Sequence, residues 1–189
     1  MESDLLVESY LRQLHLSYFL KSYRTFATDA ARSNQDYVRY LLALAEQEVS
    51  QREQRVYQRR IKAACFPALK ELADFDFSAL PDLNKAYVLD LIRGEYIARH
   101  EPILFIGNPG LGKTHLATSL ALAACRQGRK VRFWNVAGLT NELLQAQDER
   151  RLARFTTAAL KLDLVVLDEV KSREMSFNLI SKKLNCLIS

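Results

Sequence analysis

Glycine is missing from the first 70 residues of this 189-residue chain, and Pro67 is the one proline among them. Glycine and proline interrupt helices more often than other residues do, so their absence favours long helices. Apolar residues recur in this stretch at spacings of three and four, as on the buried face of a helix. We therefore expect an all-helical domain over residues 1–66, with a capping box at Ser33 and Asp36 and a last helix that ends near Cys65.

Cysteines and long apolar runs are scarce as well. Cys65, Cys125 and Cys186 stand far apart and form neither a disulfide framework nor the C-x-x-C spacing of a metal site. This pattern favours free thiols in a reducing compartment. No apolar run approaches the roughly 18 residues of a membrane-spanning helix, and residues 1–4 lack the apolar segment of a secretory signal. These absences predict a cytoplasmic protein with no membrane partner.

The chain is moderately basic, with a formal net charge of +5. Such a charge is compatible with a polyanionic partner but does not require one. On the helix expected to end near Cys65, four basic residues share one face: Arg52, Arg55, Arg59 and Lys62. A basic helix face can bind the phosphates of DNA, and an ordinary solvated face is the alternative.

The most informative motif is G-x-x-x-x-G-K-T at residues 107–114, directly after an apolar run at residues 103–106. Glycines let the backbone turn its N–H groups onto phosphate oxygens, and the helix that begins at Lys113 adds its N-terminal dipole. Lys113 is expected to reach the β- and γ-phosphates of ATP, and the Thr114 hydroxyl to bind Mg²⁺. For His115, packing is the alternative to a place in the site. The nucleotide-binding residues predicted from the loop are Gly107, Asn108, Pro109, Gly110, Leu111, Gly112, Lys113, Thr114 and His115.

A second motif follows at residues 164–169, where an apolar strand pattern ends in two acids. Asp168 is expected to hold Mg²⁺ opposite Thr114, through a bound water. Glu169 is then placed as the catalytic group that orients and deprotonates the attacking water, with Lys113 at the γ-phosphate. An acid at a strand end is common, so this motif gains its meaning from the loop that precedes it. A carboxylate at this position favours hydrolysis over phosphate transfer by a small-molecule kinase.

Strand and helix patterns alternate from residue 103 onward. The strands are expected at residues 103–107, 131–136 and 162–167, and the helices at residues 113–127 and 138–160. This alternation predicts an α/β fold, a parallel sheet flanked by helices as in a P-loop NTPase, over residues 103–189.

Residues 67–102 are expected to form a linker into that domain, with a helix at residues 83–99. Two aromatic residues of this linker, Phe75 and Phe77, are candidates to pack on the adenine ring. Packing in the core is the equal alternative for both.

Several segments together resemble the IstB-like helper ATPases of bacterial insertion-sequence transposition, which are related to the DnaC-type helicase loaders within the AAA+ class. These segments are residues 74–77, 106–117, 123–133, 141–144 and 163–169. The resemblance implies a DNA-dependent ATPase that binds double-stranded DNA, self-associates into oligomers and delivers target DNA to a transposase. It also adds Arg150, Arg151 and Arg154 to the candidates for DNA or subunit contacts.

The resemblance further implies elements after the strand that ends at Asp168. Family members continue through a helix, a strand that ends in a polar sensor residue, an arginine finger and a further helical region. Here residues 171–183 resemble that helix and residues 184–189 resemble the start of that strand. We therefore expect an AAA+ sheet that is incomplete at the C-terminus, and slow ATP hydrolysis by the protein.

Two alternative functions stay open. A DnaC-like replicative helicase loader has the same core but would bind a helicase in place of duplex DNA. A truncated nucleotide-binding subunit would bind ATP and its partner subunits with little or no hydrolysis. Comparing ATP binding with turnover, with and without DNA, separates the second alternative from the transposition helper.

Overall fold

The computed structural model describes residues 2–169 and 186–188. The chain divides into two compact units, Met1–Gln58 and Arg59–Ser189, and the division falls within one long helix.

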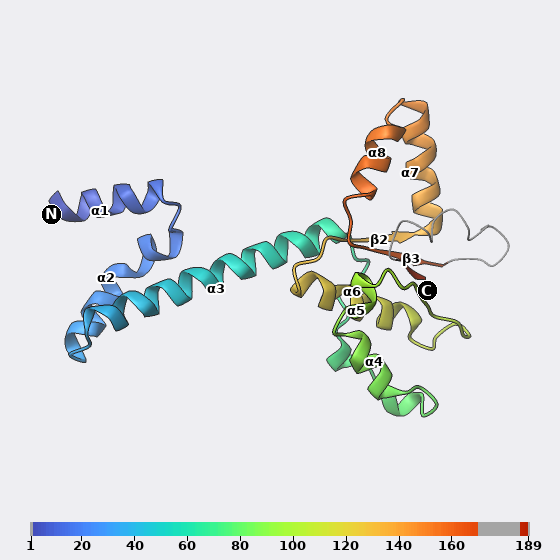
Figure 1. Cartoon of the computed structure of the whole chain (residues 1–189), viewed down its shortest axis with the longest axis horizontal. Helices are drawn as coiled ribbons and strands as arrows, with labels where there is room; N and C mark the ends of the chain where they lie inside the picture. The colour runs from blue at the N-terminus through green and yellow to red at the C-terminus, as the bar shows by residue number, and fades with distance from the viewer. Residues whose placement is uncertain (1, 170–185, 189) are drawn as a thin grey trace. The chain divides into compact units, whose positions relative to one another are not determined.

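The first unit is helical, as the scarcity of glycine predicts (Figure 1). Its elements are α1 (Glu2–Gln13), α2 (Ser17–Arg32) and most of α3 (Tyr37–Ala64). The end of α3 at Ala64 confirms the expected end of the last helix before Pro67.

The expected capping box at Ser33 and Asp36 is wrong, because the two residues serve different helices. The Ser33 hydroxyl donates to the Asp29 carbonyl at 2.7 Å, at the end of α2. Asp36 alone begins α3, where its carboxylate accepts the Arg39 N–H at 2.9 Å. A carboxylate at this position stabilises a helix start by pairing one of its free N–H groups.

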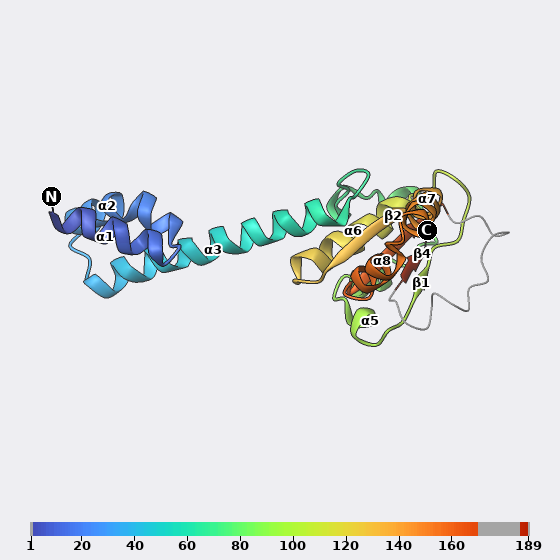
Figure 2. The same cartoon turned by 90° about the horizontal axis from the view of Figure 1, so that it is seen from above.

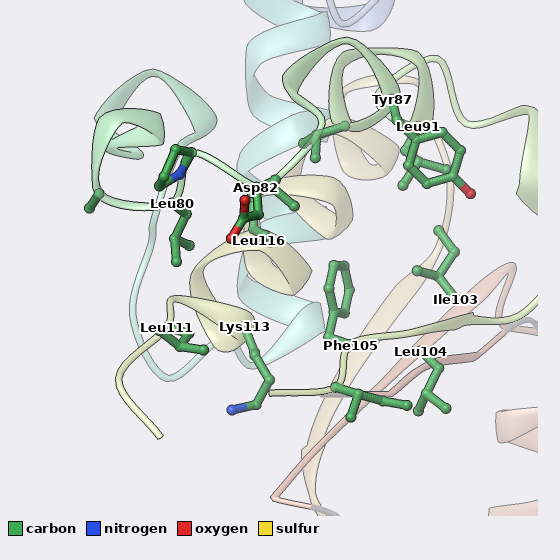
Figure 3. Close-up of a pocket in the computed structure, with 15 residues that line it drawn as sticks. Leu80, Asp82, Tyr87, Leu91, Ile103, Leu104, Phe105, Leu111, Lys113 and Leu116 are labelled. Atoms are coloured by element: carbon green, nitrogen blue, oxygen red, sulfur yellow. The ribbon is translucent and has the colours of Figure 1, made fainter. Parts of the chain in front are cut away.

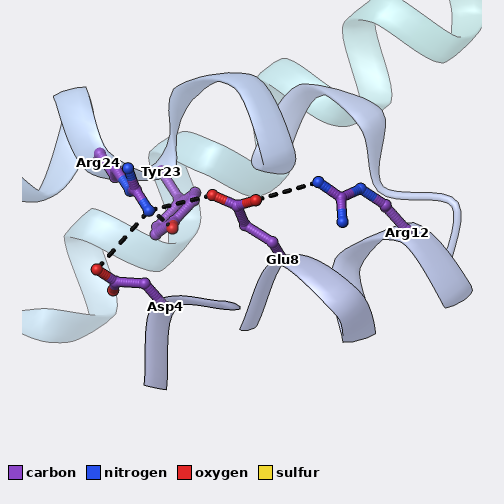
Figure 4. Close-up of polar contacts among 5 residues, drawn as sticks. All are labelled: Asp4, Glu8, Arg12, Tyr23 and Arg24. Atoms are coloured by element: carbon purple, nitrogen blue, oxygen red, sulfur yellow. Dashed lines mark hydrogen bonds and ion pairs between the residues drawn. The ribbon is translucent and has the colours of Figure 1, made fainter. Parts of the chain in front are cut away.

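Charged side chains join α1 to α2 (Figure 4). The Arg24 guanidinium lies 3.1 Å from Glu8 and 3.7 Å from Asp4. It also donates to the Tyr23 hydroxyl at 2.9 Å, and Glu8 pairs with Arg12 on its own helix at 3.1 Å. Exposed pairs of this kind contribute little each and weaken in salt.

Glu48 is the buried acid of this unit, with 3% of its surface exposed. Its carboxylate accepts the backbone N–H groups of Tyr18 at 2.6 Å and Phe19 at 3.4 Å, at the first turn of α2. Arg52 pairs with the other oxygen at 3.0 Å. Burial alone would raise the pKa of Glu48, but these hydrogen bonds outweigh it and lower the pKa below its usual value of 4.5. A carboxylate of α3 thus caps α2 from a distance.

The second unit is built on a parallel sheet with the strand order β1-β4-β3-β2 (Figures 1 and 2). The strands are β1 (Ile103–Leu104), β2 (Val131–Asn135), β3 (Leu164–Asp168) and β4 (Cys186–Ile188). All three pairings are parallel, which confirms the predicted sheet. The strand expected within residues 184–189 is confirmed as β4, and it lies between β1 and β3.

Helices cover both faces of this sheet (Figures 1 and 2). Trp134, Val165 and Leu167 form the core under α7 (Val136–Asp148) and α8 (Leu152–Ala159). The alternate residues of the same strands, including Phe133 and Val166, are buried on the opposite face, where α6 (Lys113–Arg126) packs. The pairing of Asn135 with Asp168 brings the carboxyl ends of β2 and β3 side by side.

Some expected elements are shorter or divided. The strand expected at residues 103–107 has only the two residues of β1. The helix expected at residues 138–160 is divided into α7 and α8, where Arg150 adopts a φ of 54°. The helix expected at residues 83–99 is divided into α4 (Lys85–Leu91) and α5 (Glu95–Ala98), with Gly94 at a φ of 75° between them. Left-handed residues end a helix because its hydrogen-bond pattern cannot pass through them.

Two short 3-10 turns, η1 (Leu72–Asp74) and η2 (Phe77–Ala79), precede α4. No helix within residues 2–169 is long and apolar enough to cross a membrane. The helix expected at residues 171–183 lies outside the described residues.

Candidate functional site

The loop between β1 and α6 has the backbone shape that its glycines predict. Gly110 and Gly112 adopt φ values of 84° and 74°, a region that favours glycine. α6 begins directly after Gly112, at Lys113. The first N–H groups of a helix have no partner within it, so this end of α6 offers donors and a positive dipole to an anion. This backbone geometry is suited to an anion such as a phosphate group.

Lys113 extends back into this loop. Its ammonium group donates to the carbonyl oxygens of Gly107 and Asn108, each at 3.0 Å. These two bonds hold the positive charge at the first residues of the loop. A lysine at this place supplies a point charge to a terminal phosphate.

Thr114 meets the second acidic motif directly. Its hydroxyl donates to the Asp168 carboxylate at 3.1 Å, across 54 residues of sequence. A hydroxyl and a carboxylate are the oxygen ligands that suit Mg²⁺, which commonly completes its shell with water and substrate phosphates. Residues 2–169 and 186–188 contain no cluster of three or more His, Cys, Asp or Glu side chains able to hold a metal alone. The residues present fit a magnesium ion that is shared with a phosphate ligand.

Glu169 has a partner that the sequence analysis missed. Its side chain accepts a hydrogen bond from the Asn135 amide, at the end of β2. The other end of that amide, Oδ1, accepts the Ala137 N–H at 3.0 Å and caps α7. Glu169 itself has a φ of 59°, and its N–H donates to Asp168 at 3.0 Å. The cap fixes Asn135, and Asn135 in turn fixes the carboxylate of Glu169.

A largely apolar hollow of about 550 Å³ lies beside Lys113 (Figure 3). Its walls come from the segment before α4, from α4, from β1 and from the loop. Its larger labelled apolar and aromatic lining residues include Leu80, Tyr87, Leu91, Phe105 and Leu111. Of these, only Leu111 is predicted from the sequence as a site residue. Leu91 and Phe105 are expected there only as apolar positions of a helix and a strand, and their place just before the phosphate-binding loop was the signal for the hollow.

Phe75 and Phe77 do not line this hollow. Phe75 is 9% exposed and packs with Val88 and Leu116, and the Phe77 ring lies edge-on to it at 4.9 Å. The structure therefore places both rings in the packing that supports the loop. His115, the last residue of the predicted loop set, contacts Phe75 and the Glu71 carbonyl.

The four basic residues of α3 have different surroundings. Arg52 donates to the His15 carbonyl at 2.8 Å, and Arg55 donates to the Ser17 hydroxyl at 2.7 Å. Both therefore make contacts inside the helical unit at the turn between α1 and α2. Arg59 and Lys62, further along α3, are exposed.

The fold and the phosphate-binding loop define the class. The second unit is a P-loop fold of the AAA+ type, and the chain is similar in structure to AMPPCP-bound DnaA from Aquifex aeolicus. That match has a TM-score of 0.50 and 18% identity, and covers 66% of this chain and 43% of DnaA. Within this class, residues 9–185 match the family described as IstB-like ATP binding protein, and the chain belongs to that family.

Individual relatives carry insertion-sequence names. The chain is 32% identical over 164 residues to an ATP-binding protein of insertion sequence IS5376 from Geobacillus stearothermophilus, covering 87% of this chain and 65% of that protein. It is 33% identical over 162 residues to an ATP-binding protein of insertion sequence IS21 from Pseudomonas aeruginosa, covering 86% and 60%. The chain thus spans somewhat less than two thirds of the length of these relatives.

Proposed function

We propose that this chain binds ATP with Mg²⁺ at the phosphate-binding loop and acts as an ATP-dependent helper in insertion-sequence transposition. The observation that carries the proposal is the contact between the Thr114 hydroxyl and the Asp168 carboxylate at 3.1 Å. It joins two motifs that are distant in sequence into one site with Lys113. The family and the insertion-sequence names of its relatives support the biological role.

Each residue of the site has a distinct task in this proposal. The loop N–H groups and Lys113 bind the β- and γ-phosphates, and Thr114 and Asp168 hold the metal. Mg²⁺, when bound, neutralises charge on the phosphates. Glu169 accepts a proton from the attacking water and orients it, while Asn135 sets the direction of that carboxylate.

The nucleotide base has a suitable place in the hollow beside Lys113. The lining is mostly apolar, with Tyr87 and Phe105 among its aromatic residues. Flat aromatic and aliphatic walls near a phosphate site suit a purine ring. In this arrangement Phe75 and Phe77 support the loop from behind and do not contact the base.

The partners in this proposal are double-stranded DNA, a transposase and further copies of the chain. Exposed Arg59 and Lys62 are the better candidates for DNA contact, because Arg52 and Arg55 already bind groups within the helical unit. Arg154, which the family resemblance adds as a candidate for DNA or subunit contacts, is exposed as well. Self-association is supported by large apolar side chains that are exposed on the helical unit, among them Leu5, Leu14 and Leu42.

Equilibrium binding of ATP tests the core of the proposal. Lys113→Ala removes the charge at the phosphates and is expected to weaken Mg-ATP affinity about 100-fold. Lys161→Ala, an exposed lysine elsewhere in the second unit, is the matched control and should bind like the unchanged chain. Equal affinity in all three proteins would disprove a phosphate site at this loop.

Duplex-DNA binding in the presence of ATP tests the partner. The double variant Arg59→Ala with Lys62→Ala should bind more weakly and with a shallower dependence on salt, since two phosphate contacts are lost. Lys21→Ala, an exposed lysine of α2, serves as the control. Unchanged affinity and salt dependence in the double variant would exclude these residues as the DNA contact.

A second candidate is a nucleotide-binding subunit that hydrolyses ATP slowly. One observation favours it: the Asn135 amide donates a hydrogen bond to the Glu169 carboxylate, and this bond makes the carboxylate less available to accept a proton from water. Asn135→Ala should then raise basal ATP turnover several-fold, as expected for the loss of one hydrogen bond, without a change in ATP affinity. A fall in turnover would instead show that Asn135 orients Glu169 for catalysis.

A further inference from the structure

Gly112 and His115, which flank Lys113 and Thr114, both contact the segment of residues 71–75 that precedes the site in sequence. The His115 ring nitrogen Nε2 lies 2.8 Å from the Glu71 carbonyl oxygen. The His115 ring also stands edge-on to Phe75, with ring centres 5.2 Å apart and an interplanar angle of 89°. Because a carbonyl can only accept, Nε2 must carry the proton and donate to it.

Phe75 also packs against Gly112, the residue just before Lys113 and Thr114. A Cβ atom added to Gly112 would lie 2.6 Å from Phe75 Cε2, so the ring touches the backbone of the loop. Gly112 is the residue whose φ of 74° turns the chain into α6. Phe75 is itself fixed by burial against Leu116 and Val88.

The same segment is attached to α6 further from the loop as well. The Ser119 hydroxyl lies 2.9 Å from the Lys70 carbonyl oxygen and 2.9 Å from the His115 carbonyl oxygen of its own helix, and its one proton can be donated to either. Arg126 pairs with Glu71 at 2.5 Å. Losing the contact at His115 would therefore leave the segment in place along the helix. Of these bonds to the segment, it would remove only the one nearest the phosphate-binding loop, and the Phe75 ring would still pack against Gly112.

We infer that His115 is a positioning residue of the phosphate-binding loop: through the Glu71 carbonyl and the Phe75 ring, it fixes Gly112 and the first turn of α6, from which Lys113 and Thr114 project. His115 acts through these neighbours and does not touch the nucleotide. This role deepens the proposed function and rests on it for the effect on ATP.

The variant His115→Phe tests this role, because it keeps an aromatic ring against Phe75 and removes the donor to Glu71. Ser119→Ala is the matched control, since it removes the same kind of bond to the same segment one turn further along α6. Melting temperatures of both variants are measured first, and similar small decreases are expected. Mg-ATP affinity should fall about three- to tenfold in His115→Phe, the effect of one hydrogen bond, and less than twofold in Ser119→Ala.

Hydrogen exchange of the nucleotide-free protein supplies a readout that does not depend on ATP. Backbone amides of residues 107–114 should exchange faster in His115→Phe than in Ser119→Ala or in the unchanged chain. Equal exchange in the two variants, or unchanged ATP affinity in His115→Phe, would overturn the inference. If the unchanged chain binds no ATP but the exchange difference is present, the proposed function fails and the positioning role of His115 stands.

Discussion

The interior of each of the two units is stabilised by different interactions. Within the described part of residues 1–58, Leu44 is the single buried apolar side chain, and the acid Glu48 is buried beside the start of α2. The second unit buries apolar residues on both faces of its sheet, including Phe133, Trp134 and Val166. The helical unit thus depends on hydrogen bonds and charge, and the sheet unit depends on apolar packing. Changes of pH or salt should act mainly on the first unit, and cavities should cost more in the second.

The largest effect is expected from Leu167→Ala in the sheet unit. Leu167 is 1% exposed and packs with Trp134, so the cavity should cost about 3 kcal/mol of unfolding free energy. Trp134 is the one tryptophan of the chain, and its fluorescence reports this unit during denaturant unfolding. Leu44→Ala is the counterpart in the helical unit. In this variant the helical circular dichroism signal should be lost at a lower denaturant concentration. The denaturant concentration of the Trp134 fluorescence transition should not change.

A coincident shift of both signals in both variants would contradict this division. It would mean that the two units unfold as one and that the comparison between them has no energetic basis.

A smaller effect is expected from Glu48→Gln, which weakens the cap on α2. The loss of charge from a buried group with three hydrogen-bonding partners should cost about 2 kcal/mol at neutral pH. Because folding lowers the pKa of Glu48, its contribution is fully present above the usual value of 4.5 and is lost as pH falls through the lower folded pKa. Acid titration followed by circular dichroism should therefore unfold this unit below about pH 4.5.

Glu46→Gln is the control for this titration, since Glu46 is an exposed acid on the same helix. The acid transition should persist in Glu46→Gln and flatten in Glu48→Gln. A transition that is the same in both variants would remove Glu48 as its source.

The smallest effect is expected from Arg24→Ala, which breaks the exposed contacts to Asp4 and Glu8. The destabilisation should be slight and should vanish at high salt, because salt screens exposed charges. Thermal unfolding at low and high ionic strength measures it. A loss that is independent of salt would show that Arg24 acts through packing of its aliphatic stem.

The sequence predicted best what a short motif determines. Lys113, Thr114 and the turn into α6 follow from local glycine and helix-start chemistry. Asp168 is predicted opposite Thr114 because an acid that ends a strand after a phosphate-binding loop is typical of a shared magnesium site, and the two side chains are in contact. The helical first unit followed from the lack of glycine and proline. In each case the evidence was a composition or a motif that can be recognised without knowing how the strands pair.

The sequence did not reveal what long-range pairing determines. Asn135 meets Glu169 only because β2 and β3 pair in a register that joins Asn135 to Asp168. The break between α7 and α8 depends on Arg150 at positive φ, a conformation that an arginine does not signal. Ser33 and Asp36 could each cap a helix, and tertiary structure decided which helix each one serves.

The strand order has a consequence for the biosynthesis of this protein. β1 pairs with β4, and β4 with β3, so within the described strands the segment leading to the phosphate-binding loop reaches the rest of the sheet through residues 186–188. On the ribosome, β2 and β3 can pair beneath α7 and α8 before β4, the strand that pairs with β1, has been synthesised. The nucleotide pocket should therefore be completed only after residues 186–188 have left the ribosome, later than the pairing of β2 with β3.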